Sequence, residues 1–555
     1  MPKAGKKCKS LAPPKFEEIF IMMSNRFTDA LFQLVRSLEK SEKRHFKLYI
    51  KRSSANEELK IIQLFDALDK MTEYDEKILL KKLSPVTKPQ LANLKSHLYK
   101  QLLAALRLLK STENIDLQLS ELLDNARVLY NKGLKLQAFK MLEKAKEIAK
   151  ANHKYNYLAQ VISLEKKIET LHITRSSIEK TEVLATEAAE ISRHIYDVVK
   201  LSNLALLLYR WYVQNGHARN DQDEERLKVF FKNHLPANTQ IVTDFYERLY
   251  LYQSYCWYAF IRQDFLMYYR YSRKWIDLFE EEPAMVSVET GHYVKGMHNL
   301  LNAHFDLRNF QQFEIVLRQF EAFAKTPAAN RHDNFRIHTS IYINGAKLNW
   351  HLMSGTFKEG LLLVEDIEAK MNEYALYIDR HRILVFNYKI ATLYFGSGDY
   401  ETCIDYLQRI INENMNLRID LQCYARLLHL MAHYELGNDA IIESLIKSVY
   451  RFMAKMKNLT KVEEEMFKFV RNSFNISPKL MKTELEKFLY KIKHLEKKRF
   501  ETRSFVYIDI ISWIESKMQG KTMSEIVREK SLHSRERKYT DIFSHSPQAI
   551  KRIHP

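Results

Sequence analysis

Few residues of this chain combine the type and the spacing that a chemical site requires. The stretch GKT at 520–522 matches the end of a phosphate-binding loop, but Glu515 stands where such a loop has its first glycine. His429 and His433 lie four residues apart, which places two metal-ligand types on one face of a helix. Leu430 occupies the position of the glutamate in a zinc-hydrolase helix. We therefore expect a chance pair and no metal site.

The rest of the sequence offers no recognisable catalytic pattern. The acidic run DQDEE at 221–225 lacks the glycine and the closing glutamate of a calcium loop, and it suits the first turn of a helix. We find no nucleophile elbow, dinucleotide fingerprint or paired-carboxylate pattern. The sequence therefore predicts no catalytic residue, no metal and no cofactor. An enzyme whose groups converge from distant positions is one alternative.

The composition indicates an almost entirely helical protein. The 555 residues include 12 glycines and 11 prolines, the residue types on which hairpins and sharp turns depend. None of the four cysteines forms a CxxC pair, which suits a reducing compartment. No apolar run is long enough for a membrane span, and Glu17 and Glu18 make the basic N-terminus a poor signal peptide. We expect a cytoplasmic protein.

Positive charge is concentrated at the two ends of the sequence. Of the formal net charge of +19, residues 1–110 carry +11 and residues 479–555 carry +8, so the long middle is neutral. Basic ends around a neutral body direct any contact with nucleic acid, a ribosome or an acidic protein to those ends. Solvated, lysine-rich helix faces are the simpler explanation.

A repeated pattern runs through the neutral middle. Residues 126–148 and 388–410 share one order: an apolar helix, a turn glycine, a small residue, then two spaced apolar residues. These positions are Gly133, Ala138, Leu142 and Ala145 in the first copy, and Gly398, Cys403, Leu407 and Ile410 in the second. Both copies resemble tetratricopeptide repeats, whose usual length is about 34 residues. Further turn markers follow at longer steps, at Gly216, Gln263, Arg308, Gly355 and Gly437, and two more turns are expected near 173–176 and 475–478.

This resemblance implies an all-α protein, a right-handed superhelical α-solenoid of helical hairpins. One hairpin cannot bury its apolar face alone, so each stacks on its neighbours and its helices are apolar over a wide arc. We therefore expect the many aromatic residues of 251–275 to be mainly core. The family geometry also implies a concave groove lined by the first helix of each pair. Carried over to this chain, it assigns the groove to Tyr250, Gln253, Trp257, Lys295, His298, Asn302, Tyr342, Asn349 and Tyr388.

The segment before the repeats is expected to form a basic helical bundle. Lysines recur there at helical spacing, and a helix, a short turn and a second basic helix can enter a DNA groove. Lysine and arginine side chains would then neutralise phosphates. The candidate contacts with nucleic acid or an acidic partner are Lys43, Arg44, Lys47, Lys51, Lys88, Lys95, Lys100 and Arg107.

The expected organisation has five parts. They are a basic, disordered extension (1–22), the basic bundle (23–115), the tetratricopeptide-like repeats (116–500), a capping helix (501–520) and a basic, mostly disordered tail (521–555).

The favoured function is a non-catalytic scaffold or adaptor that binds a peptide or protein in the groove, without a membrane contact. The first alternative is a regulator whose bundle contacts DNA or RNA while the repeats sense a partner.

Overall fold

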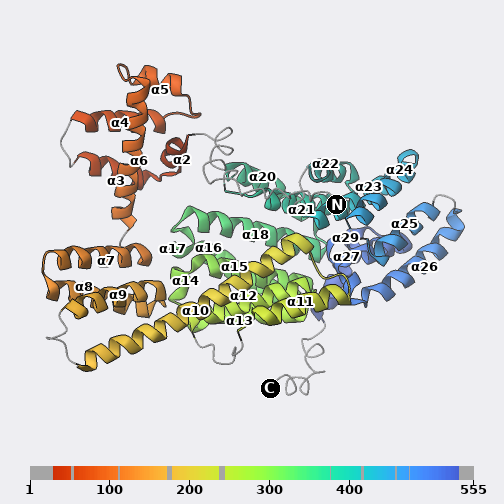
Figure 1. The fold of residues 1–555 in the computed structure, drawn as a ribbon. Coiled ribbons are helices and arrows are strands. Elements are labelled where there is room, and N and C mark those ends of the chain that lie inside the picture. The colour runs from red at the N-terminus through yellow and green to blue at the C-terminus, as the bar shows by residue number, and fades with distance from the viewer. Residues whose placement is uncertain are drawn as a thin grey trace, which may run out of the picture. The chain divides into compact units, whose positions relative to one another are not determined.

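Helices form every regular element in the described part of the chain (Figure 1). The computed structural model describes residues 29–51, 56–110, 113–171, 178–236, 244–374, 377–413, 418–456, 459–473 and 476–536. The all-α prediction is confirmed for these residues, and the predicted extension at 1–22 lies outside them. Among the described helices, none is both long and apolar enough to cross a lipid bilayer.

The chain divides into two compact units, Met1–Ser176 and Ser177–Pro555. The division falls later than the predicted boundary at 115, so the first unit includes helices of the predicted repeats as well as the bundle. Arg107 on the last bundle helix pairs with Asp124 on the next helix at 3.3 Å, and both side chains are exposed.

The first unit contains the predicted bundle and the first repeat-like helices. The bundle helices are α2 (Ala30–Ser37), α3 (Lys40–Lys51), α4 (Asn56–Asp69), α5 (Glu76–Lys82) and α6 (Lys88–Lys110). Leu91, Leu98 and Leu102 recur at helical spacing on α6, and all three are buried against the core of the bundle. The following helices are α7 (Ile115–Asn131), α8 (Lys135–Ala151) and α9 (Tyr155–Leu171).

The second unit is built mainly from consecutive helices that pack on their neighbours in sequence. Its first half contains α10 (Ile178–Asn215), α11 (Asp221–His234), α12 (Phe245–Ile261), α13 (Phe265–Glu281), α14 (Met285–Val288), α15 (Thr290–Asp306), α16 (Phe310–Ala324), α17 (Pro327–Asn330) and α18 (Asp333–Ser354). Its second half continues with α19 (Phe357–Leu361), α20 (Val364–Glu373), α21 (Arg380–Ser397), α22 (Tyr400–Ile411), α23 (Ile419–Glu435), α24 (Asp439–Lys455), α25 (Lys461–Ser473) and α26 (Pro478–Glu496). Helix α12 packs on α13, α13 on α15, and α15 on both α16 and α18 (Figure 1).

The turns between these helices fall where the repeat pattern predicts them. All seven predicted turn markers adopt positive φ angles, the left-handed conformation that ends a helix. They are Gly133, Gly216, Gln263, Arg308, Gly355, Gly398 and Gly437. Residues 476 and 477 of the predicted turn near 475–478 lie between α25 and α26, whereas Asn475 and the turn predicted at 173–176 lie outside the described residues. The spacing of helices and turns is thus confirmed, and the superhelical arrangement stays a prediction.

The aromatic stretch at 251–275 lies mainly in the core, as expected. Tyr258, Tyr268 and Trp275 are buried, and so is Cys256. Neighbouring rings extend this packing, since Phe231 stacks on Tyr258 with centroids 4.2 Å apart. Each helix contacts partners on several sides, which explains why these helices carry aromatic residues over a wide arc.

The C-terminal segment contains more helix than the expected single capping helix, whereas residues 537–555 of the expected, mostly disordered tail lie outside the described residues. It forms α27 (Thr502–Tyr507) and α28 (Ile510–Gln519), which are separated at Ile508 and Asp509, and then α29 (Met523–Glu536). Thr522 and Glu525 bond reciprocally at the start of α29, the pattern of a capping box. The buried Ile526 and Val527 hold α29 to the unit, where it packs on α16, α18, α21 and α28.

Candidate functional site

A cavity of about 680 Å³ lies within the second unit. Its walls include residues of α10, α12, α15, α18 and α21, together with the start of α23 and residues of α27. Helices α12, α15, α18 and α21 each begin one of the predicted helix pairs. A cavity of this size falls within the range of about 300–1,000 Å³ that is usual for small-ligand sites.

Seven of the nine predicted groove residues line this cavity: Trp257, Lys295, His298, Asn302, Tyr342, Asn349 and Tyr388. The other two contact the neighbouring helix α15 instead. Tyr250 meets the ring of His292 edge-on at 5.7 Å, and the side chain of Gln253 lies 2.9 Å from Nδ1 of the same histidine. Most of the predicted groove residues thus line one cavity, whereas Tyr250 and Gln253 do not line it.

One wall of the cavity is built around the ring of Tyr342 on α18. The His298 ring stacks on it with centroids 4.0 Å apart, and Lys295 Nζ lies 5.7 Å from its centroid. Arg382 donates from Nη2 to the Tyr342 hydroxyl at 3.0 Å. Asn302 donates from Nδ2 to Nε2 of His298 at 3.0 Å. This bond requires a neutral Nε2 and agrees with the pKa of His298, which burial and the nearby Lys295, Lys389 and Arg382 hold well below its usual value.

Lysine and arginine side chains give this wall positive charge. Lys389 on α21 donates from Nζ to the carbonyl oxygen of Gly345 at 3.0 Å, and burial lowers its pKa to about 8. A lysine with that pKa is still mostly protonated at neutral pH. Arg382 has an ion pair with Asp379 at 3.4 Å, but its buried Nη1 has no hydrogen-bond partner. A buried N–H donor without a hydrogen-bond acceptor lowers the stability of the folded protein, because it loses its hydrogen bonds to water.

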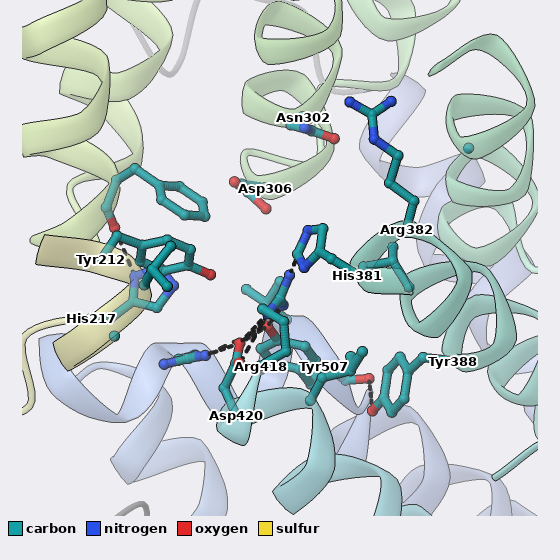
Figure 2. Close-up of a pocket in the computed structure, with 18 of the residues that line it drawn as sticks. Tyr212, His217, Asn302, Asp306, His381, Arg382, Tyr388, Arg418, Asp420 and Tyr507 are labelled. Carbon is teal, nitrogen blue, oxygen red and sulfur yellow. Dashed lines mark hydrogen bonds and ion pairs between the residues drawn. The ribbon is translucent and has the colours of Figure 1, made fainter. Parts of the chain in front are cut away.

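A second polar cluster surrounds Asp420 at the start of α23 (Figure 2). Arg418 donates from Nε to Asp420 Oδ1 at 2.9 Å, and Arg503 of α27 pairs with Oδ2. The Tyr507 hydroxyl donates to the same carboxylate at 2.7 Å. Burial opposes ionisation of Asp420, but the two arginines outweigh it and hold its pKa well below its usual value. Two buried cations on one carboxylate leave this cluster with a net positive charge.

The turn after α10 closes the cavity on another side. Gly216 lies in the left-handed conformation, and His217 then donates from Nδ1 to the carbonyl oxygen of Phe260 at 2.8 Å. Ala218 donates its backbone N–H to the carbonyl oxygen of Ile261 at 2.9 Å. These bonds attach the turn to the end of α12. Burial and the charge of Arg503 keep the pKa of His217 well below its usual value, so this ring is neutral.

Three aspartates line this cavity. Asp379 and Asp420 pair with arginines, whereas the third is Asp306, the last residue of α15 (Figure 2). Burial raises the pKa of its carboxyl group to about 7, although Arg308 acts in the opposite direction. Within the described residues, no hydrogen bond or ion pair holds this carboxylate. It also lies at the C-terminal end of a helix, where the backbone dipole disfavours negative charge.

The sequence prediction missed eight charged residues that line this cavity: Arg219, Asp306, Asp379, Arg382, Lys389, Arg418, Asp420 and Arg503. Lys389 directly follows the predicted Tyr388, and Asp306 follows Asn302 by one helical turn. Their closeness in sequence to the predicted groove residues is a signal that could have identified these two. Arg503 and Tyr507 reach the cavity from the far C-terminal end of the unit, and no local pattern marks them.

The predicted basic contacts of the first unit are largely paired with acids. Lys43 pairs with Asp69 at 2.6 Å and Lys47 with Asp66 at 2.7 Å. Lys88, Lys95 and Arg107 also have carboxylate partners. No ion pair involves Arg44, Lys51 or Lys100 within the described residues. The structure therefore leaves a smaller free basic surface than the sequence suggests.

Among the described residues, His429 and His433 contact each other and no third metal-ligating side chain. Their rings meet at 4.5 Å, and the Asn438 amide lies 2.9 Å from Nδ1 of His433. In the described part of the chain, no group of three metal-ligating side chains comes together.

Comparison with known proteins supplies no relative from which a function could be carried over. No protein-family model matches the chain, and no curated protein matches it. The function is therefore inferred from the side chains of the cavity.

Proposed function

We propose that this protein is a non-catalytic binding protein, a tetratricopeptide-like superhelical array that holds a peptide segment in the cavity of its second unit. The observation that carries the proposal is the common cavity of α12, α15, α18 and α21, which gathers seven residues assigned to a ligand groove. Amide, hydroxyl and cationic groups line it beside aromatic rings. Such a mixture suits a ligand that brings both backbone hydrogen bonds and apolar side chains.

The geometry of Gly345 offers a direct test of this proposal. A Cβ atom at Gly345 would lie 3.5 Å from Nζ of Lys389 and 3.9 Å from the Phe386 ring, both ordinary contacts. Gly345→Ala should therefore fit, whereas Gly345→Leu extends further into the cavity and occupies space that a ligand needs. The alanine variant is a matched control at the same helix position.

The experiment measures binding of a mixed-sequence pentapeptide pool to the full-length protein by equilibrium dialysis, with retained peptides quantified by mass spectrometry. We expect retention by the wild type and by Gly345→Ala, and a loss of at least about tenfold with Gly345→Leu. Equal retention by all three proteins would place any peptide binding outside the cavity. No retention by the wild type would contradict the proposed function.

A further inference from the structure

The cavity has a cationic end with unsatisfied charge. Lys295 on α15 and Arg382 and Lys389 on α21 all line it. No carboxylate pairs with either lysine within the described residues. Asp379, which contacts Arg382, has a side chain that is 61% exposed and also caps α21 through its bond to the Arg382 backbone. A ligand anion would supply the partner that buried Nη1 of Arg382 lacks.

Asp306 is the acidic residue of the same cavity that has no ion pair within the described residues, since Asp379 and Asp420 pair with arginines. Its carboxylate faces the open space with no donor from the described residues (Figure 2). The end of α15 adds the partial negative charge of its free carbonyl groups. Both features favour a ligand group that carries positive charge and N–H donors, such as an ammonium group.

Helix geometry sets the distance between the two charges. Lys295 and Asp306 are 11 residues apart on α15, so they lie about 16 Å apart along the axis at 1.5 Å per residue. A step of about 100° per residue returns them to within about 20° of the same face. His298 and Asn302 lie between them on this face, and both line the cavity. One helix face thus carries a cation, a polar middle and an anion in that order.

A short peptide with free ends matches this arrangement in charge and in length. An extended chain advances about 3.3–3.6 Å per residue, so about four or five residues separate charges that are about 16 Å apart. The amides of Asn302 and Asn349 also line the cavity and can bond to a peptide backbone. A longer chain would have to leave the cavity, and a single amino acid could not reach both charges.

We propose that the cavity recognises a short peptide by both of its free termini, with the N-terminal ammonium group at Asp306 and the C-terminal carboxylate at Lys295, Arg382 and Lys389. This inference depends on the proposed peptide-binding function and adds the chemical class and the direction of the ligand. Recognition of both termini limits the ligand to released peptides and excludes internal segments of folded or longer chains.

The test uses the same pentapeptide pool in four forms: free at both ends, acetylated at the N-terminus, amidated at the C-terminus, and blocked at both ends. Acetylation removes the ammonium charge, and amidation removes the carboxylate charge. We expect the full-length wild type to retain the free pool best, with a loss of about tenfold or more for each single block.

Two variants assign each end of the peptide to its residues. Asp306→Asn should abolish the preference for a free over an acetylated N-terminus and keep the preference for a free C-terminus. Lys295→Met combined with Lys389→Met should abolish the preference for a free over an amidated C-terminus and keep the preference for a free N-terminus. Each variant is the control for the other, because a folding defect would lower retention of all four pools together.

The outcomes separate this inference from the proposed function. Equal retention of the doubly blocked and free pools, with loss of both in Gly345→Leu, would overturn recognition of the termini and leave peptide binding intact. Unchanged terminal preferences in both charge variants would also overturn the inference. Retention of none of the four pools by the wild type would overturn the proposed function itself.

Discussion

The phenol of Tyr388 donates a hydrogen bond of 3.0 Å to the backbone carbonyl oxygen of Tyr507, 119 residues further along the chain. This bond joins the first helix of a central pair, α21, to the short helix α27. The Tyr507 ring also stacks on Tyr424 with centroids 4.3 Å apart. The far end of the second unit therefore supplies part of the wall of a cavity at its centre, and the stability of this contact bears on the shape of the site.

Asp420 is the charged centre of that contact, and its removal should destabilise the protein strongly. The Asp420→Ala variant leaves Arg418 and Arg503, which are 16% and 11% exposed, buried without their shared carboxylate. Breaking a buried ion pair in this way costs about 3–5 kcal/mol. The free energy of unfolding is measured by urea titration of the full chain. Glu359→Ala is the control, because the exposed Arg528–Glu359 pair, which also anchors the C-terminal segment, should contribute about 0–1 kcal/mol.

The same carboxylate determines how this contact responds to acid. The pKa of Asp420 is lowered in the folded state, so the unfolded chain takes up a proton at higher pH than the folded chain does. The stabilisation is complete above the ordinary aspartate pKa of about 3.9 and is lost as pH falls through the lower folded value. The difference in stability between wild type and Asp420→Ala should therefore stay constant from pH 8 to about 5 and shrink below about 4. A difference that already shrinks at neutral pH would contradict this account.

Asp306 should have the opposite effect, because burial raises its pKa to about 7 in the folded protein. Between about 3.9 and 7 the unfolded chain is ionised at this residue while the folded chain is protonated. Stability should therefore fall as pH rises through this window, and the loss should be complete above it. Asp306→Asn removes the loss, on the order of 4 kcal/mol at pH 8. Urea titrations at pH 4.5, 6 and 8 test this.

The control for Asp306 removes a negative charge from the surface of the same unit. Asp405→Asn changes an exposed residue of α22. If Asp306→Asn and Asp405→Asn gain the same free energy of unfolding relative to wild type as pH rises, the effect reflects net charge and not the position of Asp306 in the cavity.

The sequence predicted the turns of this fold well because each turn requires a local backbone conformation. Gly398 and Gly437 adopt positive φ angles that glycine tolerates best. Gln263 and Arg308 also adopt them, although glutamine and arginine have no such preference. Their positions followed from the phase of the repeat, which fixes where a helix must end before the next one can pack.

The charged parts of the site could not be predicted in the same way. Arg503 meets Asp420 across 83 residues of sequence, and only the folded C-terminal segment brings them together. Helix α29 was also missed, because its basic composition suggested a tail. Its capping box at Thr522 and Glu525 was a readable signal, and Ile526 and Val527 supply its apolar face.

The basic bundle offers a test of the nucleic-acid alternative. Arg44, Lys51 and Lys100 are the predicted contacts without an ion pair among the described residues. If they bound phosphates, replacing all three with alanine would reduce the slope of log affinity against log salt by about 2.7. We expect no such change when full-length wild type and triple variant are compared by filter binding with DNA and RNA from 50 to 200 mM salt. A difference near the calculated value would favour the regulator over the scaffold.

Gly355, at the end of α18, lies so close to α29 that a side chain at this position should displace α29. Gly398 is the control, because it shares the positive φ angle of Gly355 but not this close contact. A Cβ atom at Gly355 would lie 2.7 Å from the backbone nitrogen of Arg528 and 2.8 Å from the backbone oxygen of Ser524. At Gly398 it would meet nothing within 4 Å. Both residues have positive φ, so alanine costs about 1–2 kcal/mol at either position. Gly355→Ala must also displace α29.

We therefore expect Gly355→Ala to destabilise the protein more than Gly398→Ala and to increase amide hydrogen exchange in Met523–Glu536. The exchange is measured by mass spectrometry on the full chain, with the peptides of α29 compared between the two variants. Because Ser524 donates its hydroxyl to the carbonyl oxygen of Gly355 at 2.6 Å, displacement of α29 also breaks this bond. Equal destabilisation of the two variants, with unchanged exchange in α29, would mean that the close approach of α29 to Gly355 contributes nothing to the fold.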